Sequence, residues 1–133
     1  MINKGMRLTV DALENSNSVH FVIRLSNNTD SGKNIEFRTS QKYEIYVMNS
    51  QGKEVYRYSK GRMFTQAIEN VHLPSGESLT WKETWDYISE GKRIEPGEYR
   101  VMVNLVGKTE DGKIHFAMDS FIISNQLDLK QRW

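Results

Sequence analysis

The chain has 133 residues, with 18 lysines and arginines, 17 aspartates and glutamates, no cysteine and a formal net charge of +1. This balance gives no net electrostatic field to attract nucleic-acid phosphates or acidic lipid headgroups, which disfavours a nucleic-acid partner and a membrane partner. The lack of cysteine excludes disulfides, thiolate metal sites and a cysteine nucleophile, and it indicates a reducing cytoplasm.

The length predicts one domain, because single hydrophobic cores commonly form at about 100–150 residues. We expect this domain to span residues 1–133, with its core over about 6–124 and a flexible tail over 125–133, from which Trp133 could still dock. The N-terminus lacks the apolar region and cleavage site of a signal peptide. No apolar run approaches the ~20 residues that span a bilayer, so we expect a soluble, cytoplasmic protein.

Apolar and polar residues alternate through the first half of the chain, a pattern typical of half-buried β-strands. The runs that follow this pattern are 6–12, 19–25, 35–38, 43–49 and 54–59. Polar stretches separate them, and Gly52 suits the left-handed position of a tight turn between the last two. These runs therefore predict several short strands joined by turns.

The strand expected over 43–49 has one clear core-facing stripe, formed by Tyr43, Ile45 and Val47. Tyr46 and Met48 lie on the opposite face. Exposed aromatic and methionine side chains are typical of protein interfaces. Alternatively, both faces of a central strand are covered, here by the irregular segment after Gly61. The sequence favours neither interpretation.

Beyond this strand, Tyr56 and Tyr58 share one side and are expected to pack in the core, whereas Arg57 faces away. The segment 62–73 that follows is ambiguous. Its apolar residues fall near helical spacing, which predicts either a short helical turn or an irregular crossing. These residues are Met63, Phe64, Ala67, Ile68 and Val71.

The second half of the chain contains two further stripes and three local signals. The first stripe is formed by Leu79, Trp81, Trp85 and Tyr87, and Glu83 interrupts it. A strand beginning at Pro-Gly-Glu-Tyr places Tyr99 where immunoglobulin-like folds have a tyrosine that bonds nearby backbone. The Asp111–Gly112 pair predicts a hairpin turn. The last apolar stripe changes side near Asp119 and Ser120, which predicts a β-bulge. Together these elements predict an all-β, immunoglobulin-like antiparallel β-sandwich.

Few residues converge in a pattern that indicates catalysis. The three histidines, His20, His72 and His115, are isolated, and their spacing gives no metal signal. The chain has no nucleophile elbow and no glycine-rich phosphate loop. Glu83 could be an acid catalyst, but we favour a strand that leaves the core or a carboxylate paired with a basic neighbour. We therefore expect no enzyme, no catalytic residue, no metal and no cofactor.

One long stretch, residues 39–87, carries a family resemblance. Its pattern is Ser-Gln-x-Tyr, a glycine turn, then "VYRYS", "MFTQA", "LPSGE" and a tryptophan-bearing strand, with "PGEYRVMV" closing the pattern further on. This pattern closely resembles the BsuPI-type intracellular proteinase inhibitor family, over about residues 10–123. The resemblance implies an immunoglobulin-like sandwich that inhibits a cytoplasmic, subtilisin-type intracellular serine protease through protein–protein contact. Family members also occur within larger envelope proteins, so a non-inhibitory binding or scaffolding module is the alternative.

Two inhibitory mechanisms are open. A rigid, substrate-like loop could occupy the protease cleft, and the turn after Ser59 offers Met63 or Phe64 for its apolar pocket. Both are also core candidates, and we favour that interpretation. Alternatively, an outer strand face or edge could cap the protease. The protease-contact candidates are therefore Tyr46, Met48, Arg57, Lys60, Gly61, Arg62, Met63 and Phe64.

Overall fold

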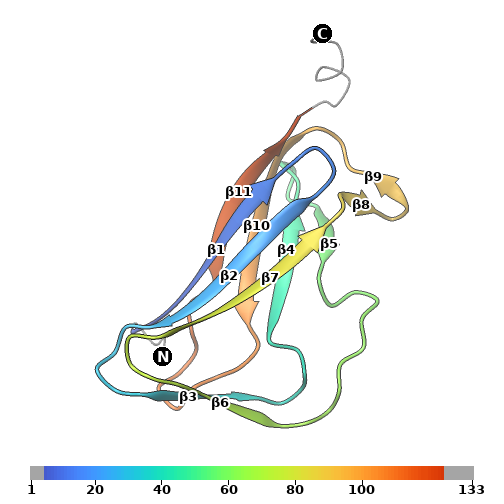
Figure 1. The fold of residues 1–133 in the computed structure, drawn as a ribbon. Helices are drawn as coiled ribbons and strands as arrows, with labels where there is room; N and C mark the ends of the chain where they lie inside the picture. The colour runs from blue at the N-terminus through green and yellow to red at the C-terminus, as the bar shows by residue number, and fades with distance from the viewer. Residues whose placement is uncertain (1–4, 125–133) are drawn as a thin grey trace.

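The computed structural model describes residues 5–124, which form an antiparallel, immunoglobulin-like β-sandwich without a helix (Figure 1). The predicted fold class is confirmed. The strands are β1 (Met6–Glu14), β2 (Val19–Asn27), β3 (Lys33–Phe37), β4 (Tyr43–Met48), β5 (Glu54–Arg57), β6 (Glu69–Leu73), β7 (Ser78–Trp85), β8 (Ile88–Ser89), β9 (Lys92–Arg93), β10 (Gly97–Leu105) and β11 (Ala117–Ile123). The tail expected over 125–133, with Trp133, lies outside the described residues.

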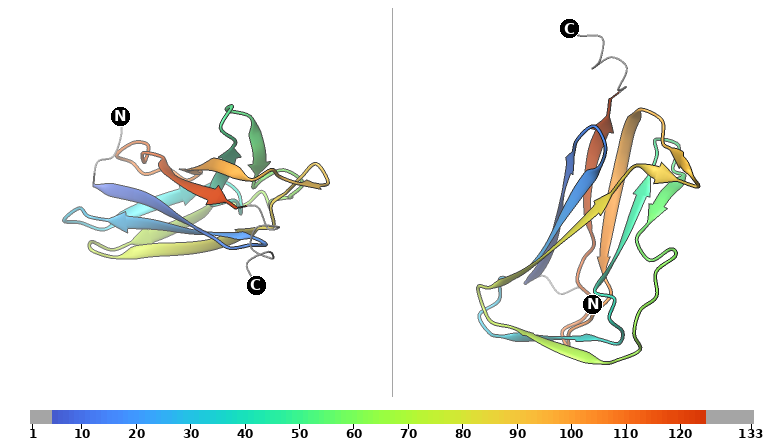
Figure 2. Two further views of the ribbon diagram at one scale, coloured as in Figure 1. Left: turned by 90° about the horizontal axis from the view of Figure 1, so that it is seen from above. Right: turned by 45° about the vertical axis from the view of Figure 1, so that its right-hand side comes forward.

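Two main sheets face each other. One has the strand order β1-β2-β7 and the other has the order β11-β10-β4-β5. The two-stranded sheet β3-β6 lies at one end of the sandwich, and the short hairpin β8-β9 lies near the opposite end (Figures 1 and 2). All pairings are antiparallel, which fits the short, turn-rich connections of the sequence.

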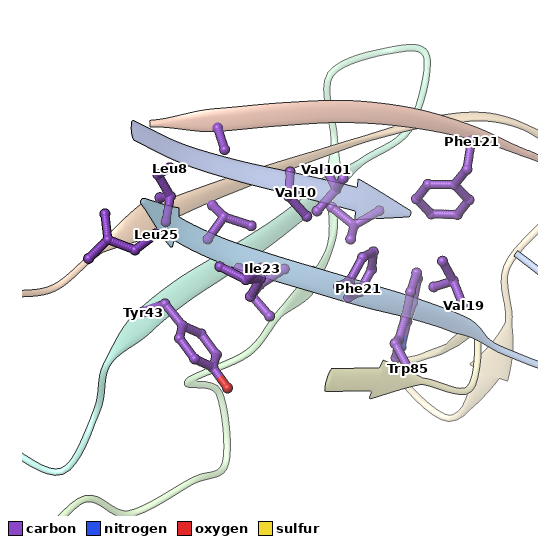
Figure 3. Packing of buried hydrophobic residues seen from close by; sticks show 14 of the residues in the cluster. Leu8, Val10, Val19, Phe21, Ile23, Leu25, Tyr43, Trp85, Val101 and Phe121 are labelled. Atoms are coloured by element: carbon purple, nitrogen blue, oxygen red, sulfur yellow. The ribbon is translucent and has the colours of Figure 1, made fainter. Parts of the chain in front are cut away.

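The core lies between the two sheets because each strand turns its apolar stripe inward. Alternate residues of β2 are fully buried, as are Ile45 and Val47 of β4 and Val101 of β10. Figure 3 shows side chains from β1, β2, β4, β7, β10 and β11 meeting in one cluster. Tyr56 and Tyr58 are half-buried and pack against this cluster, so their predicted inward side is confirmed.

The predicted tyrosine corner is present at the start of β10. The Tyr99 hydroxyl donates a hydrogen bond of 2.5 Å to the backbone carbonyl of Glu95. Its ring lies 5.9 Å from that of Phe121, and Phe121 in turn lies 6.2 Å from Phe21 of the opposite sheet. This tyrosine therefore ties the connection before β10 to the centre of the core.

The bulge predicted near Asp119 and Ser120 is wrong. The register of β10 and β11 is unbroken from Gly97–Ile123 to Val103–Ala117. The apolar stripe of the sequence changes side because Ile114 and Phe116 precede the strand and Met118 is exposed on its outer face. Asp119 instead points inward, where its carboxylate accepts a 2.8 Å hydrogen bond from the backbone N–H of Ala12. It thereby satisfies one backbone donor on the outer side of the edge strand β1.

The predicted Asp–Gly turn is present, but it does not join β10 directly to β11. Thr109 and Gly112 form an isolated bridge around this turn, inside a longer connection that precedes β11. Lys108 pairs first with Glu36 of β3, so the chain crosses the end of the sandwich before it turns. The hairpin prediction is corrected because the partner of this segment is β3, which is distant in sequence.

A buried asparagine holds the loops at this end together. The Asn27 side chain is fully buried and donates hydrogen bonds of 2.9 Å to the carbonyls of Ser31 and Leu73. Its own carbonyl oxygen accepts bonds from the backbone N–H and the hydroxyl of Thr29. The connection after β2 is thus fixed to the end of β6, which gives the next segment of interest a rigid end point.

Candidate functional site

The most exposed apolar side chain of the described residues lies between β5 and β6. Residues 59–68, which we call the crossing segment, leave the four-stranded sheet and run to the two-stranded sheet in neither helix nor strand (Figure 1). Of the two predictions for this segment, the irregular crossing is confirmed and the short helical turn is not. Met63 is 98% exposed and Ile68 is 63% exposed. The prediction that Met63 belongs to the core is wrong.

Backbone hydrogen bonds define the start of the crossing segment. The Tyr58 N–H bonds the carbonyl of Ile45 at 2.9 Å, and the Ser59 N–H bonds the Glu44 carboxylate at 3.0 Å. A turn follows in which the Arg62 N–H bonds the Ser59 carbonyl at 3.1 Å. Gly61 supplies the positive φ of 79° that this turn needs, and a side chain at this position would be strained. This turn directs Met63 outward.

Arg62 braces the segment rather than pointing freely into solvent. Its Nε donates a 2.7 Å hydrogen bond to the Tyr58 carbonyl, and its guanidinium lies 4.3 Å above the centre of the Tyr58 ring. Arg57 is similarly engaged, because it bonds Glu54 at 2.8 Å and lies 5.1 Å above the Tyr46 ring. Lys60 is exposed on the turn between them.

A second anchor follows the exposed methionine. The Thr65 N–H donates to the Ser40 hydroxyl at 2.9 Å, and the Ser40 N–H donates to the Thr65 carbonyl at 2.9 Å. Phe64 is half-buried, with its ring centre 6.0 Å from that of Tyr58. Met63 therefore projects from a short stretch of backbone that is held on both sides.

A column of aromatic side chains supports this stretch. The Tyr58 ring lies 5.2 Å from that of Tyr43, and the Tyr43 ring lies 5.6 Å from that of Trp81 on the opposite sheet. The Tyr43 hydroxyl donates a hydrogen bond to the Glu83 carboxylate. Burial raises the pKa of Tyr43 above its ordinary value, and the neighbouring Glu83 raises it further. The partner of Glu83 is thus a tyrosine, which corrects the expected pairing with a basic neighbour.

The remaining sequence candidates lie on the outer face of the four-stranded sheet. Tyr46 and Met48 are half-buried there, opposite the buried stripe of β4. Tyr46 stands beside Met102 in the sheet, and Met102 stands beside Met118 of β11. Arg57 contacts the Tyr46 ring and directly precedes the turn into the crossing segment. The candidates thus form two groups, an outer sheet face and the crossing segment, which meet at Arg57.

Two of the three histidines form hydrogen bonds with side chains of a neighbouring strand. His20 lies 2.8 Å from the Thr84 hydroxyl, and His72 lies 2.8 Å from the Asn34 side-chain oxygen. Between residues 5 and 124, no three acidic, histidine or cysteine side chains are grouped so as to hold a metal ion. No helix in that range has the length and apolar character of a membrane span.

Sequence reasoning missed two contacts that shape the site. The Ser40–Thr65 bridge joins residues 25 positions apart, and neither residue stands in a pattern that marks it. The Tyr43–Glu83 bond joins positions 40 apart, but it did have a signal, because Glu83 interrupts an apolar stripe. A charged residue inside such a stripe indicates that a polar partner lies across the core.

Comparison with known proteins identifies the family. Residues 6–110 match the family model described as BsuPI, intracellular proteinase inhibitor. The chain belongs to this family. The matched range runs from the first residue of β1 to the turn beyond β10, so the BsuPI match includes the crossing segment and Glu83. The search of curated proteins gave no match.

Solved structures similar to this BsuPI chain share its fold at low identity. A β-glucosidase from Kluyveromyces marxianus has 19% identity and a TM-score of 0.50, with 90% of this chain and 14% of that chain covered. β-Glucosidase 3B from Thermotoga neapolitana has 16% identity and a TM-score of 0.50, with 90% of this chain and 16% of that chain covered. The BsuPI chain thus spans about one-sixth or less of these enzymes, and the likeness concerns the β-sandwich alone.

Proposed function

We propose that this chain inhibits a cytoplasmic serine protease of the subtilisin type by placing the crossing segment in the cleft, with Met63 in the primary specificity pocket. One observation carries the proposal: Met63 is 98% exposed, yet the backbone beside it is fixed on both sides. The BsuPI family consists of intracellular proteinase inhibitors, which supports a protease as the partner. The mechanism requires no cofactor.

Restraint of the segment favours binding. A free peptide loses conformational entropy when it is immobilised in a cleft, whereas a segment already held in place loses less. The bonds from Arg62 to Tyr58 and between Thr65 and Ser40 supply this restraint without a disulfide. Subtilisin-type clefts receive substrate as an added strand, and their primary pocket favours a large apolar side chain, which Met63 offers.

The same anchors can make cleavage reversible. In the first step the protease serine adds to the Met63 carbonyl, and the peptide bond to Phe64 breaks as the amine of Phe64 takes up a proton. Phe64 remains packed on Tyr58, and Thr65 remains bonded to Ser40, so the amine stays near the acyl group. It can then attack the acyl-enzyme, reform the peptide bond and release the serine before water enters.

A matched pair of variants tests the proposal. The protein is titrated into an intracellular subtilisin-type protease with a small chromogenic substrate, and activity should fall to near zero at about one-to-one stoichiometry. Met63→Glu should weaken inhibition about 100-fold or more, because a carboxylate in an apolar pocket is left without a partner. Ile122→Glu is the control, because Ile122 is 61% exposed on β11 and lies outside the crossing segment.

Two outcomes would contradict different parts of the proposal. Unchanged protease activity at large excess of the wild-type chain would refute the inhibitory function and favour the alternative, a binding or scaffolding module. Equal inhibition by wild type and Met63→Glu would show that the crossing segment does not contact the protease. The outer sheet face with Tyr46 and Met48 would then be the surface to test.

A further inference from the structure

Glu83 is a charged residue on the inward stripe of β7, between Trp81 and Trp85, and it stands opposite Phe21 in the register of β2 and β7. It is half-buried. An apolar residue here would continue the stripe, so the carboxylate is a departure from the local pattern. Such departures are expected where function requires a particular group.

The carboxylate reaches across the sandwich to the four-stranded sheet. It accepts the hydroxyl hydrogen bond of Tyr43 on β4. Figure 3 shows Tyr43 at the edge of the core cluster, with its hydroxyl directed away from the other apolar side chains. Burial raises the pKa of the adjacent Tyr58, and the charge of Glu83 adds to that rise. Glu83 also attracts Arg62 electrostatically.

Both residues that flank Met63 rest on the ring that this network holds. The Arg62 guanidinium lies over the Tyr58 ring and its Nε donates to the Tyr58 backbone carbonyl, while Phe64 packs against the same ring. Tyr58 in turn packs on Tyr43, the residue bonded to Glu83. A continuous series of contacts therefore runs from β7 of one sheet, through Tyr43 on β4 of the other sheet, to the two neighbours of Met63 in the crossing segment.

We propose that Glu83 is a positioning residue of the inhibitor: it holds residues 62–64 so that, after the Met63–Phe64 bond is cut, the new ends stay together and rejoin. This inference rests on the proposed function. Without Glu83, water should hydrolyse the acyl-enzyme before the amine of Phe64 attacks it. The chain should then be a substrate that inhibits the protease only temporarily.

Glu83→Leu tests the role, because it restores the apolar stripe while removing the carboxylate. Excess protease is added, and mass spectrometry follows cleavage between Met63 and Phe64 while the chromogenic assay follows recovery of activity. Cleavage should be at least tenfold faster than in wild type, with a melting temperature no lower than that of wild type. Lys82→Leu is the matched control, since Lys82 is the adjacent charged residue on the exposed face of β7.

A second variant and a second measurement keep the test independent of folding defects and of the target. Tyr43→Phe removes only the hydroxyl that bonds Glu83 and should also speed cleavage. Amide hydrogen exchange needs no protease: the N–H groups of Arg62 and Thr65 should exchange at least tenfold faster in Glu83→Leu, while amides of β10 stay unchanged. Equal exchange and equal cleavage in wild type and both variants would overturn the proposal for Glu83. Faster exchange together with a wild-type chain that never inhibits would sustain the positioning and refute only the proposed function.

Discussion

Replacement of Tyr58 by alanine removes the ring on which the crossing segment rests. This ring contacts Tyr43 at 5.2 Å and Phe64 at 6.0 Å between ring centres, and the guanidinium of Arg62 lies 4.3 Å from its centre. The hydrogen bond between the Tyr58 N–H and the Ile45 carbonyl belongs to the backbone and survives the change. The variant therefore tests side-chain packing apart from strand pairing.

The expected cost follows from the half-buried state of the Tyr58 side chain. A fully buried aromatic side chain covers about 200 Å², so half burial covers about 100 Å², worth about 2.5 kcal/mol. The two ring contacts and the contact with Arg62 add about 0.5 kcal/mol each and bring the total to about 4 kcal/mol. The ring lies at the margin of the core and leaves no closed cavity, so no cavity cost is added. The melting temperature should fall by roughly 10 °C.

Thermal denaturation and the inhibition assay together check this prediction, with Tyr58→Phe as the control. The phenylalanine variant keeps the ring and should lose less than about 1 kcal/mol while inhibiting like wild type. The alanine variant, assayed well below its melting temperature, should bind the protease more weakly and be cleaved faster. A fall of less than about 3 °C in Tyr58→Ala would show that the ring is not packed. Normal inhibition by the same variant would show that the ring does not shape the crossing segment.

Three further changes address stability. Burial holds the pKa of Tyr43 in the folded state above its ordinary value near 10. The contribution of Tyr43 to the free energy of unfolding is therefore fully present below about pH 10, and it is lost as the pH rises toward the folded-state pKa. Urea titrations at pH 10 and pH 11 should show that the free energy of unfolding falls with pH less steeply in Tyr43→Phe than in wild type. The difference in slope should be up to about 1.4 kcal/mol per pH unit. Tyr99→Phe leaves the Glu95 carbonyl without its donor and should cost about 1–2 kcal/mol in chemical denaturation; no loss would show that the corner bond is dispensable. Gly107→Ala places a methyl group 2.6 Å from the Phe37 ring and should cost about 1–3 kcal/mol, whereas an unchanged melting temperature would show that Phe37 can move aside.

The strand pattern could be predicted because it is local. In β2 and β4 every second side chain is buried, and the same period of two is visible in the sequence as alternating apolar and polar residues. The tyrosine corner at Tyr99 was equally readable, since its bond reaches only four residues back to Glu95. Such features need no knowledge of what lies across the core.

The errors arose where a residue's surroundings depend on distant chain. The bulge was predicted in error because β11 begins only at Ala117, after a connection that first pairs with β3, and because Met118 is exposed although it is apolar. Met63 and Phe64 have the same apolar character and adjacent positions, yet one is exposed and the other packs on Tyr58. The turn at Gly61 comes just before both residues and sets which of them points outward, and side-chain type alone does not encode its direction.

The sequence by itself determined an all-β sandwich, the inward side of most strands and, through a long resembling stretch, the BsuPI family of intracellular proteinase inhibitors. Only the tertiary structure decided which apolar residue of the crossing segment is exposed and what holds the backbone beside it. The physical reason is that the anchors of Met63, from Thr65 to Ser40 and from Tyr43 to Glu83, join atoms 25 and 40 positions apart. Ser40 and Thr65 meet only where the connections between the four-stranded sheet and the β3-β6 sheet run side by side, and Tyr43 and Glu83 meet only when the two main sheets pack face to face.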